Sequence, residues 1–404
     1  MPGESPLSMM QTDLPRAPKS AGAGGVRVSR RRLPRVFVAA VIVVALAVGW
    51  CGLWYFAASI TGRTLTGWLE REAAAGRIYS CGSQDISGFP FRIEVRCTGA
   101  AATLKDTQPP FAVAAKDITF AAQVFRPTVL TGEVSSPISL ADLAQPPRFT
   151  ATWSLARLSV SGVPPQPDSL AVNVEQPRIN QVAGATATTL FAADRAAAQS
   201  RVIEGTAAAN PVVDTVVQFA SASAPTVHPL LADPLQANFE LVVRGLKDLS
   251  PKSWAARFRE MQAAGGNIEI KSLRIERTDA VVVGNGTLTV NEHGRLDGIV
   301  RVAVSGIEHI VPLLGIDRLI GQSIDRFTGQ SGQQSGGLAT LDRLMPGLSG
   351  VVRQSANAGV IDNLKRMGQP TEIDNKPAII LPLRFNDGVM SVGMIPLGTV
   401  PALF

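Results

Sequence analysis

The sequence predicts a mainly β protein of the α+β class, with an extended, curved antiparallel sheet, a few packing helices and one preceding transmembrane helix. Two observations carry this prediction. Residues 36–58 form one uncharged apolar run, and from residue 118 onward short runs alternate apolar with polar side chains and end in turn residues. The composition agrees, because 46% apolar against 17% charged residues is not typical of a largely disordered chain.

A basic leader precedes the apolar run. Residues 1–35 hold seven basic and two acidic side chains, which accounts for +5 of the net charge of +6, and they are rich in Pro, Gly and Ser. The excess positive charge therefore belongs to a tail that we expect to be disordered. The remainder of the chain is nearly neutral, so we expect no nucleic acid as a partner.

The apolar run itself predicts a single membrane crossing. As a helix, its 23 residues are about 35 Å long, enough for a hydrocarbon core of about 30 Å. Arginines gather on its N-terminal side, so the positive-inside rule leaves residues 1–35 in the cytoplasm and exports residues 59–404. The length favours an uncleaved signal anchor. A cleaved signal peptide and a buried helix of a soluble protein are the alternatives.

Three cysteines test the compartment. Cys51 lies inside the apolar run, whereas Cys81 and Cys97 flank a segment centred on the turn-prone residues 87–90. If that turn reverses two strands, the two cysteines lie opposite each other, and we expect a disulfide in an oxidising periplasm. Two separately buried thiols are the alternative. No Cys-x-x-Cys pair or neighbouring histidine supports a zinc site.

Alternating side chains predict the strands. They occur in residues 118–124, 149–155, 170–174 and 239–243, and after Arg157 the pattern resumes out of phase, which predicts a β-bulge there.

The clearest meander covers residues 267–304, with another change of phase between Ile270 and Leu273. A C-terminal hairpin is predicted around residues 386–388, where Asp-Gly suits the turn. Short strands joined by turns favour antiparallel pairing.

Helical spacing occurs in three further places. Residues 60–78 are predicted to continue the membrane helix, and Ser250 with Pro251 is expected to cap a helix that reaches about residue 264. A helical region covers about 307–367 and is interrupted by the linker-like residues 329–337. We expect these helices to pack on the sheet as lids.

Catalytic patterns are scarce. The sequence has no complete G-x-S-x-G, P-loop or dinucleotide fingerprint, and its three histidines, His228, His293 and His309, are interpreted as structural. Two acidic sets are candidate sites. Solvation and ion pairing are the favoured interpretation of both, and no metal or cofactor is expected. The sets are Glu292, His293 and Asp297, and Asp317, Asp325 and Asp342.

One motif carries a family resemblance. The candidate motif is Gly88, Phe89, Pro90, Phe91 and Arg92, flanked by Cys81 and Cys97. With the anchor, residues 124–134, the 267–304 meander and the C-terminal segment, it resembles the proteobacterial domain-of-unknown-function family 2125. That resemblance implies an envelope protein anchored in the inner membrane and supplies no catalytic residues. A more distant similarity connects the strand phrases to AsmA-like β-groove proteins.

Three functions are compatible with these features, in order of preference. The sequence favours a noncatalytic, membrane-anchored periplasmic protein that acts as a structural or assembly partner of other envelope proteins. The alternative is a module that binds or transfers lipid or another amphiphile on an apolar sheet face. A hydrolase with an unrecognised acidic pair is the least favoured. The motif residues are interpreted as hairpin architecture before ligand contacts.

Overall fold

The computed structural model describes residues 35–105, 107, 109–143, 145–163, 166–184, 186–250, 252–314 and 348–404. The chain divides into two compact units, and the boundary falls between Leu53 and Trp54. The second unit thus begins five residues before the boundary at 58/59 that the sequence predicts.

Helix α1 (Arg35–Ala74) contains the predicted apolar run and its continuation. Among the described helices it alone is long and apolar enough to span a membrane, a property that anchors and signal sequences share. Gly76, at φ +86°, follows its last turn, and the Gly76 amide donates to the carbonyl of Ala73. This left-handed position suits glycine and ends the helix before the first strand.

Antiparallel strands dominate the second unit, which confirms the predicted fold class. The strands of its first half are β1 (Arg77–Ser80), β2 (Ser83–Ser87), β3 (Arg92–Leu104), β4 (Phe111–Gln123), β5 (Arg126–Val134), β6 (Ile138–Asp142), β7 (Pro147–Thr152), β8 (Leu155–Ser161), β9 (Ser169–Glu175), β10 (Arg178–Ala183) and β11 (Thr186–Ala192). Those of the second half are β12 (Arg195–Thr206), β13 (Ala209–Ala222), β14 (Leu235–Val243), β15 (Asn267–Glu276), β16 (Val281–Val290), β17 (Leu296–Ser305), β18 (Gln369–Ile373), β19 (Lys376–Asn386), β20 (Val389–Val392) and β21 (Ile395–Thr399).

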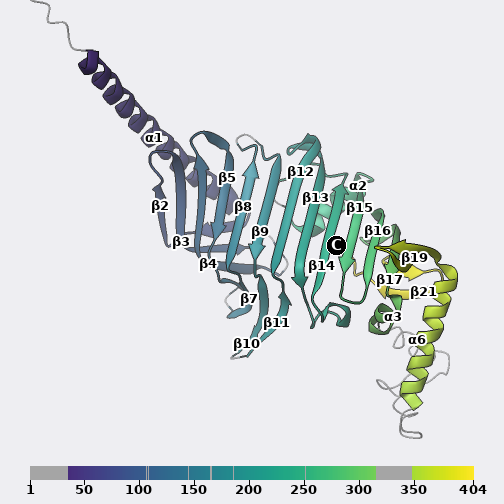
Figure 1. Ribbon diagram of the computed structural model, residues 1–404. Coiled ribbons are helices and arrows are strands. Elements are labelled where there is room, and N and C mark those ends of the chain that lie inside the picture. The colour runs from purple at the N-terminus through teal and green to yellow at the C-terminus, as the bar shows by residue number, and fades with distance from the viewer. Residues whose placement is uncertain are drawn as a thin grey trace, which may run out of the picture. The chain divides into compact units, whose positions relative to one another are not determined.

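The main row of the sheet follows the chain closely. β1 and β2 share one side of β3, and the pairing then runs through β4, β5, β8, β9 and β12 to β17 before it reaches β19 (Figure 1). β18 and β20 both pair with β19, and β21 closes the row. Many neighbours are joined by hairpins, whereas β5–β8, β9–β12 and β17–β19 are not consecutive in the chain, and the β13–β14 and β14–β15 connections contain η1 and α2.

A branch leaves this row at β4. Residues 118–123 of β4 pair with β5, whereas residues 111–115 pair with β6, and β7, β10 and β11 continue from β6 (Figure 1). The strands break along one line, which we call the crease. It passes between β5 and β6, β7 and β8, β9 and β10, and β11 and β12. Backbone hydrogen bonds lie on the crease itself, including one from the Gln176 amide to the Asp194 carbonyl at 2.8 Å.

The covered part of the sheet lies at its C-terminal end. α3 (Ile307–Ile310), η2 (Val311–Leu314) and α6 (Leu348–Met367) contribute apolar side chains to a core with β17 and β19. Val302, Val311 and Leu381 are almost completely buried there. The interpretation of these helices as elements packed on the sheet is therefore confirmed for the described residues. The predicted linker 329–337 lies outside them.

Two local predictions are corrected. Helix α2 (Trp254–Ala263) begins later than expected, because the hydroxyl of Ser253, not Ser250, accepts a hydrogen bond from the Ala256 amide at 3.3 Å. The phase change near Arg157 reflects a strand break at residues 153–154 on the crease rather than a bulge after Arg157. The short helix η1 (Pro229–Leu231) was not predicted. The phase change between Ile270 and Leu273 is confirmed as a register shift.

Candidate functional site

Strand register places the apolar side chains of the main row on one face. Ala198 of β12 lies opposite Val217 of β13 and Val172 of β9, and the same alternation continues outward in both directions. Directly paired residues of antiparallel strands share a face of the sheet. The alternation read from single strands therefore adds up to one continuous surface across nine neighbouring strands, from β3 to β15.

We call this surface the apolar face. Its large members are Ile93 and Val95 of β3, Ile118 and Phe120 of β4, Leu130 and Val134 of β5, Leu158 and Val160 of β8, Leu170, Val172 and Val174 of β9, Val202 of β12, Val213, Val217 and Phe219 of β13, Phe239, Leu241 and Val243 of β14, and Ile268, Ile270, Leu273 and Ile275 of β15.

The apolar face is only partly shielded from solvent. Leu170 is exposed and the other large members are half-buried, whereas Val300 and Val302 on the same side of β17 are buried beneath the C-terminal helices. Within the described chain, α3, η2 and α6 bury side chains of β17 and β19, whereas the large apolar side chains of the nine strands from β3 to β15 keep at least intermediate exposure on this face. A partly exposed apolar surface of this extent is unusual, which makes this face the candidate site.

The described elements border this face at its two ends and along one side. At the β2 end, helix α1 lies close to the sheet, since a Cβ built on Gly62 would be 3.6 Å from the side chain of Ile86. Ile86 pairs with Val95, which belongs to the apolar face. Along the side, Phe191 of the β6–β7–β10–β11 branch packs edge-on against Phe219, with ring centroids 6.0 Å apart. At the far end α3, η2 and α6 cover β17 and β19.

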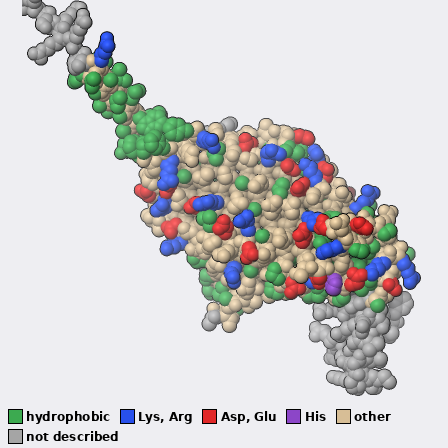
Figure 2. Space-filling model, in the orientation of Figure 1, with side chains coloured by type: hydrophobic (Ala, Val, Ile, Leu, Met, Phe, Trp, Pro, Cys, Tyr) green, Lys and Arg blue, Asp and Glu red, His purple; other side chains and the backbone are tan. Residues whose placement is uncertain are grey.

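The opposite face of the same strands is mainly polar, although Val242 of β14 on that side is fully buried. Arg157 pairs with Glu133 at 2.9 Å and Lys271 with Asp214 at 3.1 Å, across strands that lie side by side. Figure 2 shows this side, where acidic and basic side chains are scattered over the strands. Solvated ion pairs of this kind add little stability, but they keep the polar face hydrated while the other face of the sheet is apolar.

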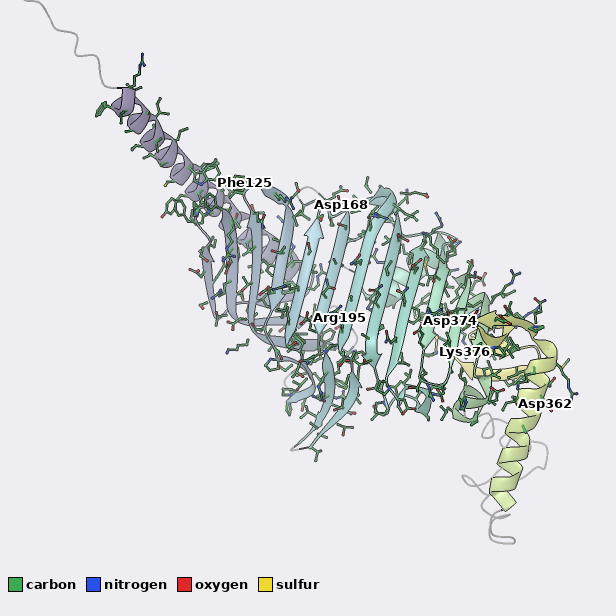
Figure 3. The ribbon with its side chains drawn as sticks, viewed as in Figure 1. Phe125, Asp168, Arg195, Asp362, Asp374 and Lys376 are labelled. Carbon is green, nitrogen blue, oxygen red and sulfur yellow. A yellow bond between two sulfur atoms is a disulfide. The ribbon has the colours of Figure 1, made fainter. Side chains whose placement is uncertain are left out.

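A shallow cleft of about 300 Å³ lies chiefly on the polar face. Its lining includes Arg195, labelled in Figure 3, and the buried amide oxygen of Asn238, which has no hydrogen-bond partner among the described residues. The guanidinium of Arg274, also in the lining, is bound by Glu276 and by Asp374. Because these two carboxylates neutralise it, the cleft presents one arginine among amides and no nucleophile with an adjacent base.

The predicted disulfide is confirmed. Cys81 and Cys97 are bonded, and their Cα atoms lie 5.4 Å apart at the β2–β3 hairpin. Gly88 in the turn has φ +100°, and a Cβ there would lie 2.8 Å from the Arg92 carbonyl oxygen, so the turn requires glycine. The other motif residues differ in their surroundings. Arg92 pairs with buried Glu94 at 2.8 Å, whereas Phe89 and Phe91 point largely to solvent.

The acidic sets do not assemble into a site in the described chain. Asp297 accepts hydrogen bonds from the Asp387 amide at 2.6 Å and from the Asn291 side chain, while Glu292 and His293 are exposed. No group of three metal-ligating side chains occurs among the described residues. Asp317, Asp325 and Asp342 lie outside them.

The histidines make local contacts. His228 caps η1, because its Nδ1 accepts from the Leu230 amide at 3.1 Å. His293 lies 3.7 Å from Asp387, and His309 lies 3.6 Å from Asp279. All three contacts lie in loops or at helix ends, and a structural role is enough to explain these histidines.

One ion cluster shifts the pKa of its members. Lys252 binds Asp248 at 2.8 Å and Glu260 at 2.9 Å, which connects the start of α2 to the preceding loop. The Lys252 ammonium, assisted by Ser250, holds the pKa of Asp248 well below its ordinary value. For Glu260, burial acts to raise the pKa, but Lys252 and the Lys247 amide outweigh it and the pKa is lowered. This pattern is typical of an anchoring cluster.

The comparison with known families matches this second unit. A family model described as an uncharacterized protein conserved in bacteria (DUF2125) covers residues 54–401. The chain belongs to this DUF2125 family. The match begins at the residue where the second compact unit begins, so the DUF2125 region and the folded β unit coincide. No curated protein matches the chain. The family resemblance is therefore confirmed, and the AsmA-like similarity stays a prediction.

The sequence did not predict the extent of the apolar face. Alternation in each strand was visible, but the pairing that joins nine strands and leaves them uncovered depends on the register of the whole sheet. The exposed rings of Phe89, Phe91 and Phe125 also went unrecognised as a group, although the first two belong to the predicted motif.

Proposed function

We propose that the DUF2125 unit binds the hydrocarbon part of a lipid or similar amphiphile on its apolar face, without catalysis. The observation that carries the proposal is the contrast within one sheet surface, which is half-buried from β3 to β15 and buried beneath helices at β17. A sheet that covers its core at one end and leaves nine strands open at the other has apolar area available for a ligand.

The dimensions suit an acyl chain. Nine strands at about 4.8 Å spacing extend over about 38 Å, and one leaflet of a hydrocarbon core of about 30 Å is about 15 Å thick. Each methylene buried against the face contributes about 0.8 kcal/mol before the cost of immobilisation. A single acyl chain therefore has room and driving force, and the polar reverse face keeps the loaded unit in water.

We further propose that the unit works beside the membrane from which such a ligand comes. Residues 36–53 immediately precede it and form part of the α1 helix, whose apolar stretch is long enough to span a bilayer. The arginines of the leader favour a cytoplasmic N-terminus in a bacterial inner membrane and a periplasmic DUF2125 unit. The disulfide is consistent with an oxidising compartment.

Photo-crosslinking tests lipid binding. The full chain would carry p-benzoylphenylalanine in place of Val172 on the apolar face or, as the matched control, in place of Asn173 on the polar face of the same strand. After illumination in cells, adducts would be identified by mass spectrometry. We expect lipid adducts at Val172 at least about tenfold above those at Asn173, because adjacent strand residues face opposite sides.

Other products would contradict the proposal. A protein adduct at Val172 would favour the assembly role that the sequence predicts. A crosslink from Val172 to residues 315–347 would mean that the chain itself occupies the face. Equal lipid yield at both positions would indicate unspecific contact. As a second variant, Val172→Asp should reduce copurified lipid while Asn173→Asp leaves it unchanged, with the intact disulfide as the check on folding.

Topology has its own test. A reporter active only in the periplasm, fused after Phe404 of the full chain, should be active, and a reporter active only in the cytoplasm should be silent. The opposite result would overturn the proposed localisation. The lipid-binding proposal would then still be decided by the crosslinking experiment.

A further inference from the structure

We propose that the aromatic tips of two hairpins dock the DUF2125 unit on the surface of a lipid bilayer. The tips are the β2–β3 turn with Phe89 and Phe91 and the β4–β5 turn with Phe125. This inference is independent of lipid binding on the apolar face, because these rings lie in turns at the ends of the strands.

The two turns form one surface. The Val124 amide donates to the Phe91 carbonyl at 2.9 Å, and the rings of Phe91 and Phe125 stack with centroids 6.0 Å apart. Despite this contact their exposure is high, at 59% and 71%, and Phe89 is 50% exposed. Three phenylalanines held together and open to water at one place require an apolar partner.

The tight hairpin turns along the rest of this sheet edge lack such rings, whereas the longer β14–β15 connection at the same edge carries Trp254 of α2, which is 79% exposed. The β16–β17 turn at residues 291–295 and the β19–β20 turn at residues 387–388 are at the same edge and consist of polar residues, glycine and arginine. Figure 3 labels Phe125 and Asp168 along this edge. Tight turns are ordinarily polar, so aromatic residues in two adjacent tight turns distinguish the first two hairpins from the other hairpin turns of this edge.

The bilayer is the occupant that the neighbouring residues favour. Trp54, the first residue of the unit, donates from its indole nitrogen to the Arg92 carbonyl at 2.9 Å, and its ring packs edge-on against Phe89 at 5.5 Å. Because Leu53 precedes Trp54 in the chain, the apolar segment 36–53 is covalently joined to a residue that contacts the tips. A membrane-spanning segment that ends at Trp54 would bring the interface to this point.

Further groups at the tips match the chemistry of the interface. Tyr55 and Phe56 are 68% and 63% exposed, and aromatic rings concentrate where hydrocarbon meets water. Arg92 and Arg126 are exposed beside the tips, within reach of lipid phosphates. A protein partner would equally accept the rings, but only a bilayer is brought to them by the chain's own connectivity.

The test distinguishes bilayer lipid from carried lipid. The full chain, with p-benzoylphenylalanine at Phe125, is placed in vesicles of deuterated phosphatidylethanolamine and phosphatidylglycerol and illuminated. The control position is Val227, 69% exposed in the connection between β13 and β14 at the opposite edge. Deuterated adducts come from the vesicle, and undeuterated adducts come from lipid that was purified with the protein.

We expect deuterated adducts at Phe125 about tenfold above those at Val227. Phe91→Ser combined with Arg126→Glu should lower the yield at Phe125 severalfold, and both changes affect exposed side chains. Equal deuterated yields at Phe125 and Val227, only undeuterated adducts, or adducts to protein would each overturn the proposal. The Val172 crosslink in the same vesicles reports on the apolar face alone, so the two proposals can fail separately.

Discussion

The β3–β15 region and the β17–β19 region share the same alternation of apolar and polar residues, but their apolar sides are buried to different extents. In both, aliphatic residues line one side of the strands, yet Leu158 is half-buried while Leu381 is buried against Leu364 and its neighbours in the C-terminal core. The two regions differ in the segments that connect their strands. Most connections within β3–β15 are turns or further strands, with η1 and α2 as the helical exceptions, whereas the segment after β17 supplies the helices that bury β17 and β19. Alternation thus predicts a two-sided sheet but does not predict which part of it is covered.

The largest expected effect comes from the covered region. Leu381→Ala should lower the free energy of unfolding by about 2–5 kcal/mol, because it leaves a cavity among buried side chains, whereas Leu158→Ala should cost about 1 kcal/mol or less. Urea denaturation of both variants in the same detergent measures the difference. Similar losses at both positions would mean that the apolar face is a filled core.

The disulfide should give the next largest effect, at the uncovered end. Replacement of Cys81 and Cys97 by serine removes a link of sequence separation 16, which should lower the free energy of unfolding by about 3 kcal/mol. Cys51→Ser is the control, since that thiol is free and should change stability little. If the double variant unfolds with the wild-type midpoint, the uncovered hairpins do not depend on this link.

The smallest effect concerns pH at the Asp248 cluster. Because Lys252 lowers the pKa of Asp248 in the folded state, the ionised carboxylate stabilises the fold above its ordinary pKa of about 3.9, and this contribution is lost as the pH falls through the folded value. Asp248→Asn should therefore be less stable than wild type at neutral pH, by about 1 kcal/mol or less, and the two should converge in acid. A difference that persists at the lowest pH would contradict this account.

Local chemistry made several features predictable from the sequence. The Asp387-Gly388 turn, the Cys81–Cys97 pair and the register shift after Ile270 each depend on a few neighbouring residues. The α2 start was wrong because Ser250 and Ser253 are both competent caps, and the sequence provides no measure of which hydroxyl meets a free amide.

Features that depend on distant strands were not predictable. The crease requires breaks in strands far apart in sequence, and only one of them, near Trp153, left a trace in the pattern. The apolar face requires the full register. The aromatic tips could be predicted only if the turns at Phe91 and Phe125 were known to be neighbours, and the β3–β4 pairing determines that.

The short strands β1 and β2, which share one side of β3, also affect whether sheets of separate molecules can pair edge to edge. They leave only four- and five-residue segments at that margin, and the strand at the opposite margin, β21, carries Pro396. Short margins and proline offer few amides in a row for another molecule to pair with. These two margins of the main row therefore give another molecule little to pair with, in contrast to the long, regular margins that favour fibre-like stacking.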